Sequence, residues 1–336
     1  MLFRNIQHLR AFAAIIVVLY HSIGAFLAYY PEANSVNFIL TSIKTWGACG
    51  VDIFFVISGF ILYHTFKRGS SNSFANFFLK RMIRIVPLYI ILTLVFSAIL
   101  GFFPAAVKSV SFDWSWMILS LFFLAQLFVN SDPILYVGWS LEWEMFFYLL
   151  FIILFFLKKF ELFSLILIFL TLVIVSIFSS NFIAVEFFLG ILACQFLHNK
   201  KEQLKKYSPI IFLVGFLSML YSFHNYELRN DVDRFFLWGI PSFFLVLGAA
   251  LGQDWKSTVT TYLGGASYSI YLIQVFSIPI FFKVTTFFSF WNSWDIFNVG
   301  LCTIFTIFLG VALHTLVEKP VIQLMKNYFG FERKRI

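Results

Sequence analysis

The first residues that could carry chemistry are Arg10 and His21, which lie eleven positions apart in an apolar segment. Eleven residues make close to three turns of an α-helix, so the two side chains share one face within about 20°. The helix rise places His21 roughly 16 Å along the axis from Arg10, near the middle of a bilayer. An imidazole suits general-base work near neutral pH. A histidine that is hydrogen-bonded to a neighbouring helix would look the same in the sequence, and both interpretations stay open.

A second basic pair, Arg81 and Arg84, precedes Pro87 at the start of another apolar segment. Residues at i and i+3 lie on one helix face. Two adjacent guanidinium groups suit a phosphate or pyrophosphate group, because each offers several donors in a planar fork. The alternative is that both arginines only anchor the helix at a cytoplasmic membrane surface.

Three carboxylates lie in apolar surroundings, where an ionised side chain is unfavourable unless it is paired or functional. Glu142 and Glu144 stand two positions apart and point to different helix faces, which excludes a paired-carboxylate dyad. We expect one of them to face the protein core and the other the membrane interface, with a function for at least one. Asp52 could pair with a cation such as protonated His21 or an arginine, or it could cap the start of its helix.

These residues need elements that hold them inside a membrane. Of the 336 residues, 61% are hydrophobic and 12% are charged, whereas soluble domains carry about 25% charge. The mean hydropathy is +0.89. The sequence therefore predicts an all-α, polytopic membrane protein. Apolar runs of spanning length, about 17–25 residues, predict ten transmembrane helices near residues 11–29, 47–65, 85–103, 139–157, 162–178, 183–197, 208–223, 235–252, 262–283 and 296–317.

One further apolar run, 116–129, is short and is flanked by polar residues. If it enters the membrane and returns to the same side, 19 of the 24 lysines and arginines lie on the cytoplasmic side. If it crosses instead, most of them lie outside, which the positive-inside rule disfavours. We therefore predict one re-entrant or interfacial segment and both termini in the cytoplasm. Such a segment must be buried in protein or line a wet cavity.

The rest of the sequence adds no second unit. No repeat, soluble domain or linker is evident, so residues 1–336 are predicted to form one integral-membrane domain. The net charge of +8 comes from short basic clusters between apolar runs, which indicates membrane topology and not nucleic-acid binding. His314 and Glu318, one turn apart, are expected to form a structural pair. The three cysteines have no metal-ligand spacing, so we expect buried apolar roles and no metal site for Cys49, Cys194 and Cys302.

Six ordered motifs resemble those of the acyltransferase type 3 family of integral-membrane acyltransferases, nearly from end to end. They are Leu9-Arg10-Ala11 leading to Tyr20-His21, Gly50-Val51-Asp52-Ile53-Phe54-Phe55-Val56-Ile57-Ser58-Gly59-Phe60, Arg81-Met82-Ile83-Arg84-Ile85-Val86-Pro87-Leu88-Tyr89, Trp139-Ser140-Leu141 with Glu144, Ser267-Tyr268-Ser269-Ile270-Tyr271-Leu272 and Val317-Glu318-Lys319-Pro320. One late motif often continues to a histidine, where this chain has Gln274. The segment Glu142–Tyr148 looks most like the branch that acetylates bacterial exopolysaccharides.

This resemblance implies a membrane O-acyltransferase of a bacterial-type inner (cytoplasmic) membrane. The acyl group, usually acetyl, would come from cytoplasmic acetyl-CoA and pass to a hydroxyl of an exported polysaccharide or its lipid-linked precursor. His21 would act on that hydroxyl or relay the acyl group, while two carboxylates would orient His21 or the sugar. The site residues so implied are Arg10, Arg81 and Arg84 for the coenzyme's phosphates, and His21, Glu144 and Asp52 for catalysis.

The partners expected on this basis are acyl-CoA, a glycan or lipid-linked sugar acceptor and membrane lipid, with no nucleic acid. Association into a homo-oligomer stays open. A transporter or flippase of a lipid-linked glycan is the main alternative, since charges inside the membrane and a re-entrant segment would serve it equally. A glycosyltransferase that uses lipid-linked phosphosugars is disfavoured, because residues 30–46 offer only Glu32 where such enzymes carry acidic pairs.

Overall fold

The computed structural model describes residues 3–30, 43, 45–69, 74–103, 112–129, 131–179, 181–224, 231–286 and 295–331. Within these ranges the chain is helical and contains no strand. Nine helical segments of the described chain are long and apolar enough to cross a membrane. The predicted all-α, polytopic class is therefore confirmed.

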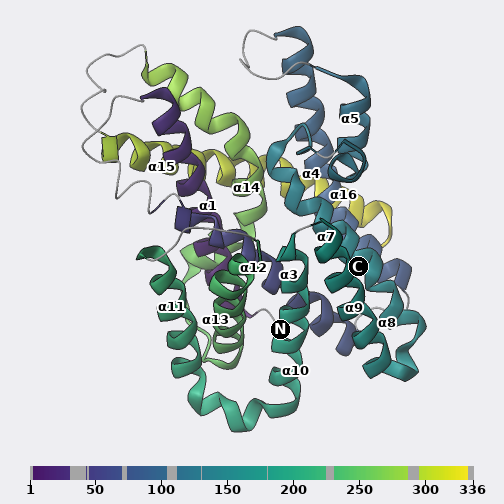
Figure 1. Cartoon of the computed structure of the whole chain (residues 1–336). Coiled ribbons are helices and arrows are strands. Elements are labelled where there is room, and N and C mark those ends of the chain that lie inside the picture. The colour runs from purple at the N-terminus through teal and green to yellow at the C-terminus, as the bar shows by residue number, and fades with distance from the viewer. Residues whose placement is uncertain are drawn as a thin grey trace, which may run out of the picture.

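Long helices alternate with short helical turns along the chain (Figure 1). The first half contains α1 (Arg4–Tyr29), α3 (Cys49–Lys67), α4 (Phe74–Phe102), α5 (Trp114–Leu121), α6 (Ala125–Val129), η2 (Tyr136–Gly138), α7 (Trp139–Leu150), α8 (Ile152–Phe156), η3 (Lys158–Phe160) and α9 (Glu161–Ser179). The second half contains η4 (Phe182–Val185), α10 (Glu186–Leu204), η5 (Lys205–Tyr207), α11 (Ser208–His224), α12 (Asp231–Arg234), η6 (Phe235–Gly239), α13 (Ile240–Leu251), α14 (Thr258–Thr285), α15 (Asp295–Leu313), η8 (His314–Glu318) and α16 (Lys319–Tyr328).

The nine segments differ from the ten predicted spans at one place. Phe182–Phe223 forms a single apolar helical stretch of 42 residues, which contains α10 and α11 joined by η5. Figure 1 shows α10 and α11 as the two arms of a hairpin. This stretch therefore holds two crossings, and the short predicted span 183–197 corresponds to α10, which continues to Leu204.

Helices α1, α3 and α14 pack together in the bundle. α1 and α14 run parallel, because Arg10 bonds to Ser267 toward their starts and Tyr30 bonds to Thr285 at their ends. Helix α3 runs antiparallel to α1, because the His64 ring near the end of α3 contacts the ring of Phe3, which directly precedes α1. The side chains on one face of α1 therefore point at α14.

α10 packs on α3 at two glycines. A Cβ on Gly190 would lie 2.1 Å from the carbonyl oxygen of Val56, and a Cβ on Gly59 would lie 2.0 Å from the carbonyl oxygen of Phe187. Small residues permit such close approach of two backbones, and membrane helices use it because lipid provides no hydrophobic driving force between them. The position of α3 relative to α10 thus depends on both glycines.

Replacing Gly190 by Ala is expected to lower the stability of the purified protein by about 1–3 kcal/mol, because the added methyl group forces two backbones apart. Gly300→Ala in α15 is the matched control, since nothing lies within 4 Å of a Cβ at that position. The midpoint of thermal unfolding in detergent measures both effects. Equal midpoints for the two variants would contradict the close contact of α3 and α10.

The segment after α4 turns back on itself, as predicted for the run 116–129. Asp113 caps α5 by accepting a hydrogen bond from the Trp116 backbone N–H at 2.7 Å. Hydrogen bonds from Ser115 and Trp116 also lower the pKa of Asp113. The Trp116 indole N–H donates to the carbonyl oxygen of Asp132 at 3.0 Å. The beginning and the end of this segment therefore lie side by side.

Glu142 anchors the returning segment to α7. Its carboxylate accepts hydrogen bonds from the backbone N–H groups of Ala125 and Gln126 at 3.1 and 2.9 Å. These groups begin α6, where a helix carries partial positive charge. The expectation that one of the two glutamates faces the membrane interface is wrong: Glu142 is buried, and Glu144 lines an internal pocket. The cap on α6 explains why a buried carboxylate is tolerated there.

Both ends of the described chain lie at one end of the bundle. The Phe3 ring contacts His64 near the end of α3, and the Lys80 ammonium near the start of α4 lies over the Phe331 ring. Few residues separate α3 from α4 in the sequence, so residues 3 and 331 share one side of the membrane. The assignment of that side to the cytoplasm stays a prediction from the positive-inside rule.

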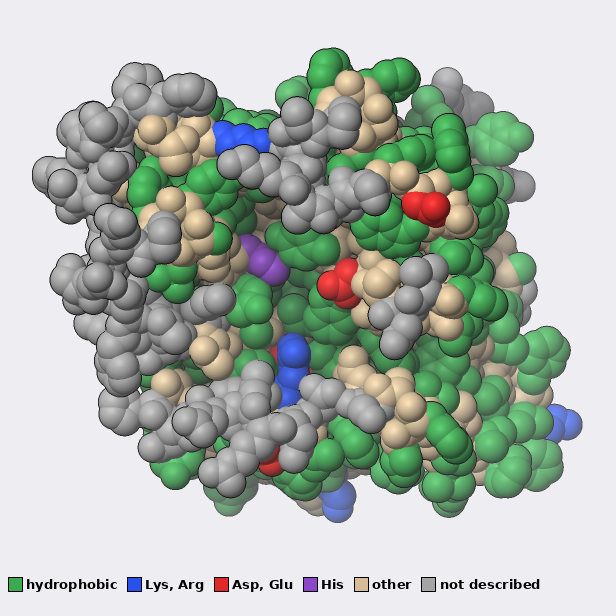
Figure 2. Space-filling view, turned by 45° about the horizontal axis from the view of Figure 1, so that its top comes forward, with side chains coloured by type: hydrophobic (Ala, Val, Ile, Leu, Met, Phe, Trp, Pro, Cys, Tyr) green, Lys and Arg blue, Asp and Glu red, His purple; other side chains and the backbone are tan. Residues whose placement is uncertain are grey.

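Apolar side chains cover the outside of the bundle, as lipid contact requires. Figure 2 shows a mostly hydrophobic face with few charged groups and a histidine side chain in a hollow. Helix α9 exposes a row of large apolar side chains: Leu162, Phe163, Ile166, Leu170, Ile174 and Phe178. The polar groups that could act on a substrate therefore lie among the helices.

Candidate active site

One pocket among the helices collects the three arginines that the sequence predicted for a phosphate site. Arg10 comes from α1, while Arg81 and Arg84 come from α4. Glu144 from α7 lines the same cavity. We call this cavity the arginine pocket; its polar lining consists of Arg10, Ser58, Arg81, Arg84, Ser140, Glu144, Tyr148, Ser267, Tyr268 and Tyr271.

The three arginines differ in how firmly protein groups hold them. Arg10 is 7% exposed, and its guanidinium donates to Ser267 Oγ at 2.8 Å. Arg81 donates to Thr65 Oγ1 at 3.2 Å. Within the described part of the chain, no side chain hydrogen-bonds the Arg84 guanidinium. Arg84 therefore keeps its planar set of donors for a bound anion.

Glu144 balances part of the positive charge of the arginine pocket. Its Oε1 accepts hydrogen bonds from Ser58 Oγ at 2.9 Å and from the Tyr148 hydroxyl at 2.5 Å. Ser58 lies on α3, so this carboxylate joins α3 to α7 across the pocket wall. Three guanidinium groups and one carboxylate leave an excess of positive charge, which favours an anionic ligand.

His21 lines a second pocket further along α1. Its Nδ1 lies 3.4 Å from the hydroxyl of Tyr136, the first residue of η2. The shared face of Arg10 and His21 is confirmed, because both point toward α14. No residue lines both cavities. We call the second cavity the histidine pocket, and it is lined by Tyr20, His21, Gly24, Ala25, Tyr136, Ile278 and Pro279.

A tyrosine of α14 connects the walls of the two pockets. Tyr271 lines the arginine pocket, and its hydroxyl donates to the carbonyl oxygen of Val137 at 2.8 Å. The same hydroxyl lies 2.9 Å from Ser140 Oγ. Val137 belongs to η2, which also carries Tyr136 of the histidine pocket. A movement of η2 would therefore change both pockets together.

Asp52 lies outside both pockets and forms an ion pair between α3 and α12. Its two carboxylate oxygens accept hydrogen bonds from Arg234 at 3.0 and 2.9 Å. The Asp52 side chain is fully buried, and that of Arg234 is 17% exposed. Of the partners considered from the sequence, the structure pairs Asp52 with an arginine and not with His21. The contacts of Asp52 are thus those of a group that ties two helices together.

Glu318 and His314 form the pair that their spacing predicts. The Nδ1 of His314 lies 2.6 Å from Glu318 Oε2, which also accepts a hydrogen bond from Ser269 Oγ at 2.6 Å. These residues bound the π-helical turn η8, and such turns are frequent at functional sites. Ser269 stands two positions after Ser267, the partner of Arg10. The pair therefore braces the part of α14 that holds Arg10.

Several residues of the site had no role predicted from the sequence. Tyr148 could have been found, because it lies one helical turn after Glu144. Ser267 lies in one of the six motifs, but the motif does not indicate which side chain Ser267 contacts. Tyr136 and Tyr271 reach their partners only through packing between helices, for which a single sequence carries no signal.

This arrangement defines a class: a polytopic membrane protein with a buried cationic pocket and a histidine further along the same helix. The sequence profile of a known family, described as an acyltransferase domain, matches residues 3–315. The chain therefore belongs to the acyltransferase type 3 family, and the resemblance seen in the six motifs is confirmed.

One relative adds a more specific likeness. The exopolysaccharide production protein ExoZ of Rhizobium meliloti (strain 1021) is 40% identical to this chain over 112 residues. The match covers 32% of this chain and 34% of ExoZ, so it spans about a third of that relative's length. No solved structure matches the chain.

Proposed function

We propose that this protein transfers an acyl group, in the first place acetyl, from acetyl-CoA to a hydroxyl of an exported polysaccharide or its lipid-linked precursor. The observation that carries the proposal is the arginine pocket, in which three guanidinium groups line one cavity. Coenzyme A is rich in phosphate, and guanidinium groups bind phosphate oxygens through paired N–H donors. The likeness to ExoZ, an exopolysaccharide production protein, supports a polysaccharide acceptor.

The proposed orientation places the protein in the inner (cytoplasmic) membrane with the arginine pocket toward the cytoplasm. Arg84, which has no side-chain partner in the described chain, takes a phosphate of the coenzyme, and Arg10 and Arg81 complete the phosphate contacts. Glu144 offsets part of the positive charge of the arginines and positions the wall of the pocket through Ser58. Asp52 ties α3 to α12 through its ion pair with Arg234.

His21 supplies the base of the proposed reaction. In the tautomer with hydrogen on Nδ1, the ring donates to the Tyr136 hydroxyl and leaves Nε2 as an acceptor. Nε2 takes the proton of the acceptor hydroxyl while the hydroxyl oxygen bonds to the thioester carbonyl carbon. The carbon–sulfur bond then breaks, and the coenzyme leaves as a thiol after its sulfur takes up that proton. Tyr136 orients the ring for this transfer.

Membrane vesicles of known orientation test the proposal. Inside-out and right-side-out vesicles with wild-type protein receive acetyl-CoA with a radiolabelled acetyl group, and the label is followed into lipid-linked and polymeric glycan. We expect incorporation when the donor meets the cytoplasmic face. Incorporation only from the other face would overturn the orientation. Movement of glycan without any incorporation would replace the acyltransferase proposal by a transporter or flippase.

Arg84→Ala is expected to raise the KM for acetyl-CoA roughly 10–100-fold, because a hydrogen bond to a charged group contributes about 1.5–3 kcal/mol. Arg68→Ala is the matched control, since Arg68 follows α3 at the same end of the bundle and lines neither pocket. Initial rates at varied acetyl-CoA measure the effect. An unchanged KM in Arg84→Ala would show that the coenzyme does not bind in the arginine pocket.

A further inference from the structure

Three metal-binding side chains converge between α3 and α10, away from both pockets. His64 lies on α3, and Cys194 and His198 lie one turn apart on α10. One ring nitrogen of each histidine and the sulfur of Cys194 lie within 4.8 Å of one another. His64 Nδ1 is 3.2 Å from His198 Nε2, although the two residues are 134 positions apart. Packing of α3 on α10 thus assembles donors whose spacing in the sequence indicated no metal site.

We propose that His64, Cys194 and His198 bind a zinc ion. Two imidazole nitrogens and a thiolate form a ligand set that zinc prefers. Tetrahedral zinc with bonds of about 2.0–2.1 Å to nitrogen places two ligand nitrogens about 3.3 Å apart, close to the 3.2 Å between the histidines. A zinc–sulfur bond of about 2.3 Å puts the sulfur about 3.6 Å from each nitrogen. A movement of the Cys194 sulfur by roughly 1 Å meets that distance.

The surroundings of the cluster favour a bound ion over a simple pair of histidines. Cys194 is fully buried, and the rings of Phe3 and Phe60 pack on His64. His64 Nε2 is buried and has no hydrogen-bond partner among the described residues. His64 presents its other ring nitrogen, Nδ1, to His198, so Nδ1 is the atom that would bind the ion. His198 is exposed, which gives an ion access from solvent.

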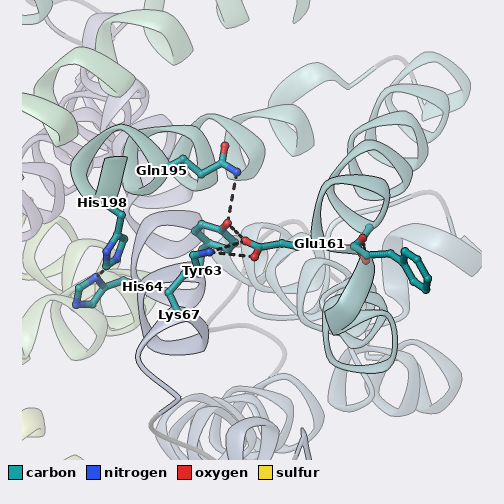
Figure 3. A network of polar contacts seen from close by, with 8 residues as sticks. Tyr63, His64, Lys67, Glu161, Gln195 and His198 are labelled. Atoms are coloured by element: carbon teal, nitrogen blue, oxygen red, sulfur yellow. Dashed lines mark hydrogen bonds and ion pairs between the residues drawn. The ribbon is translucent and has the colours of Figure 1, made fainter. Parts of the chain in front are cut away.

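An ion pair neutralises Lys67 beside the cluster, while Arg68 and Lys201 add positive charge near the histidines, which the Cys194 thiolate would offset. Lys67 forms an ion pair with Glu161 at 2.9 Å. Tyr63 donates to the same carboxylate, and Gln195 donates to Tyr63. Figure 3 shows this network next to the two histidines. The network also lines an open pocket that reaches His198, which leaves room for water as the fourth ligand of zinc.

The position of the cluster assigns the ion a structural role. None of the three ligands lines the arginine pocket or the histidine pocket. The ion would join α3 to α10 beyond the contact of Gly59 with Phe187. Helix α3 also carries Ser58, which holds Glu144 in the arginine pocket. Zinc would therefore fix a helix that shapes the active site, and this inference stands whether or not the proposed function is correct.

Cobalt(II) binding to the full-length protein tests the proposal. The protein is purified in detergent, freed of its affinity tag and stripped of metal. We expect stoichiometric cobalt binding with the ultraviolet charge-transfer absorption of a cobalt–thiolate bond, which zinc then displaces. Cys194→Ser should abolish this absorption. Cys302→Ser is the matched control, because Cys302 is also a buried free cysteine and lies outside the cluster.

A second variant and a second measurement keep the test independent of misfolding. His198→Ala changes an exposed side chain, so it preserves the buried packing, and it should weaken cobalt binding at least tenfold. Zinc should raise the thermal unfolding midpoint of the wild type but not that of His198→Ala, because a ligand stabilises only the state that binds it. Wild-type protein that binds cobalt no better than His198→Ala would overturn the proposal. Absorption lost in Cys302→Ser but kept in Cys194→Ser would overturn it equally.

Discussion

His21→Ala is expected to lower the kcat of acetyl transfer by about 10²–10⁴-fold, with little change in the KM for acetyl-CoA. His21 lines the histidine pocket and not the arginine pocket. Its loss therefore removes the proposed proton acceptor and leaves the contacts to the coenzyme in place, a pattern that lowers kcat alone. Initial rates of label transfer, measured at varied acetyl-CoA, give both constants.

His8→Ala is the matched control for His21→Ala. His8 lies on the same helix, but its ring contacts the Trp255 carbonyl and the Thr260 hydroxyl, so we expect a kcat near that of the wild type. Tyr136→Phe should have an intermediate effect, a loss of about 3–10-fold, because one hydrogen bond to the ring contributes about 1 kcal/mol. A kcat in His21→Ala equal to that in His8→Ala would reassign His21 to helix packing.

Arg234→Met is expected to destabilise the protein by about 3–5 kcal/mol, the usual effect of removing one partner of a buried ion pair. The guanidinium of Arg234 holds both oxygens of the fully buried Asp52. Glu186 is also fully buried and lies beside Asp52. Without Arg234, two carboxylates remain together in an apolar interior. The thermal unfolding midpoint in detergent, with a check of monodispersity, measures the loss.

Asp52→Asn distinguishes this ion pair from a general effect of mutation. It removes one carboxylate and leaves Arg234 beside Glu186, so we expect a smaller loss of about 1–3 kcal/mol. The double variant Asp52→Asn with Arg234→Met should be more stable than the sum of the single losses implies, since the two groups interact directly. Strictly additive losses would show that the two side chains are not paired in the folded protein.

The helices were predictable because the thickness of a bilayer sets the length of an apolar run that crosses it. Within the bilayer, a helix satisfies the hydrogen-bonding groups of its own backbone. The returning segment was predictable for another reason, the balance of charges on the two sides, and the contact of Trp116 with Asp132 confirms it. The predicted span 85–103 corresponds to the apolar part of α4. The helix itself begins at Phe74, because a helix continues beyond its apolar part into a polar membrane surface.

Within the site, only the contacts between residues of one helix were predictable, because they follow from helical periodicity. His314 and Glu318 are one turn apart, and the structure pairs them. Asp52 and Arg234 are 182 positions apart, and only the packing of α3 against α12 and η6 brings them together. The zinc cluster depends on packing in the same way. A single sequence specifies which residues share a helix face, but not which face of another helix they meet.

Helix α1 runs without interruption from Arg4 to Tyr29 and carries Arg10 in one pocket and His21 in the other. A continuous helix does not shorten, so the attachment points of these two side chains stay about 16 Å apart whatever is bound. Under the proposed function, α1 therefore sets the distance that the acyl donor must span between the two pockets. A thioester whose linker is shorter than this distance would occupy the arginine pocket without delivering its acyl group. The protein would then select its donor by the length of the linker as well as by charge.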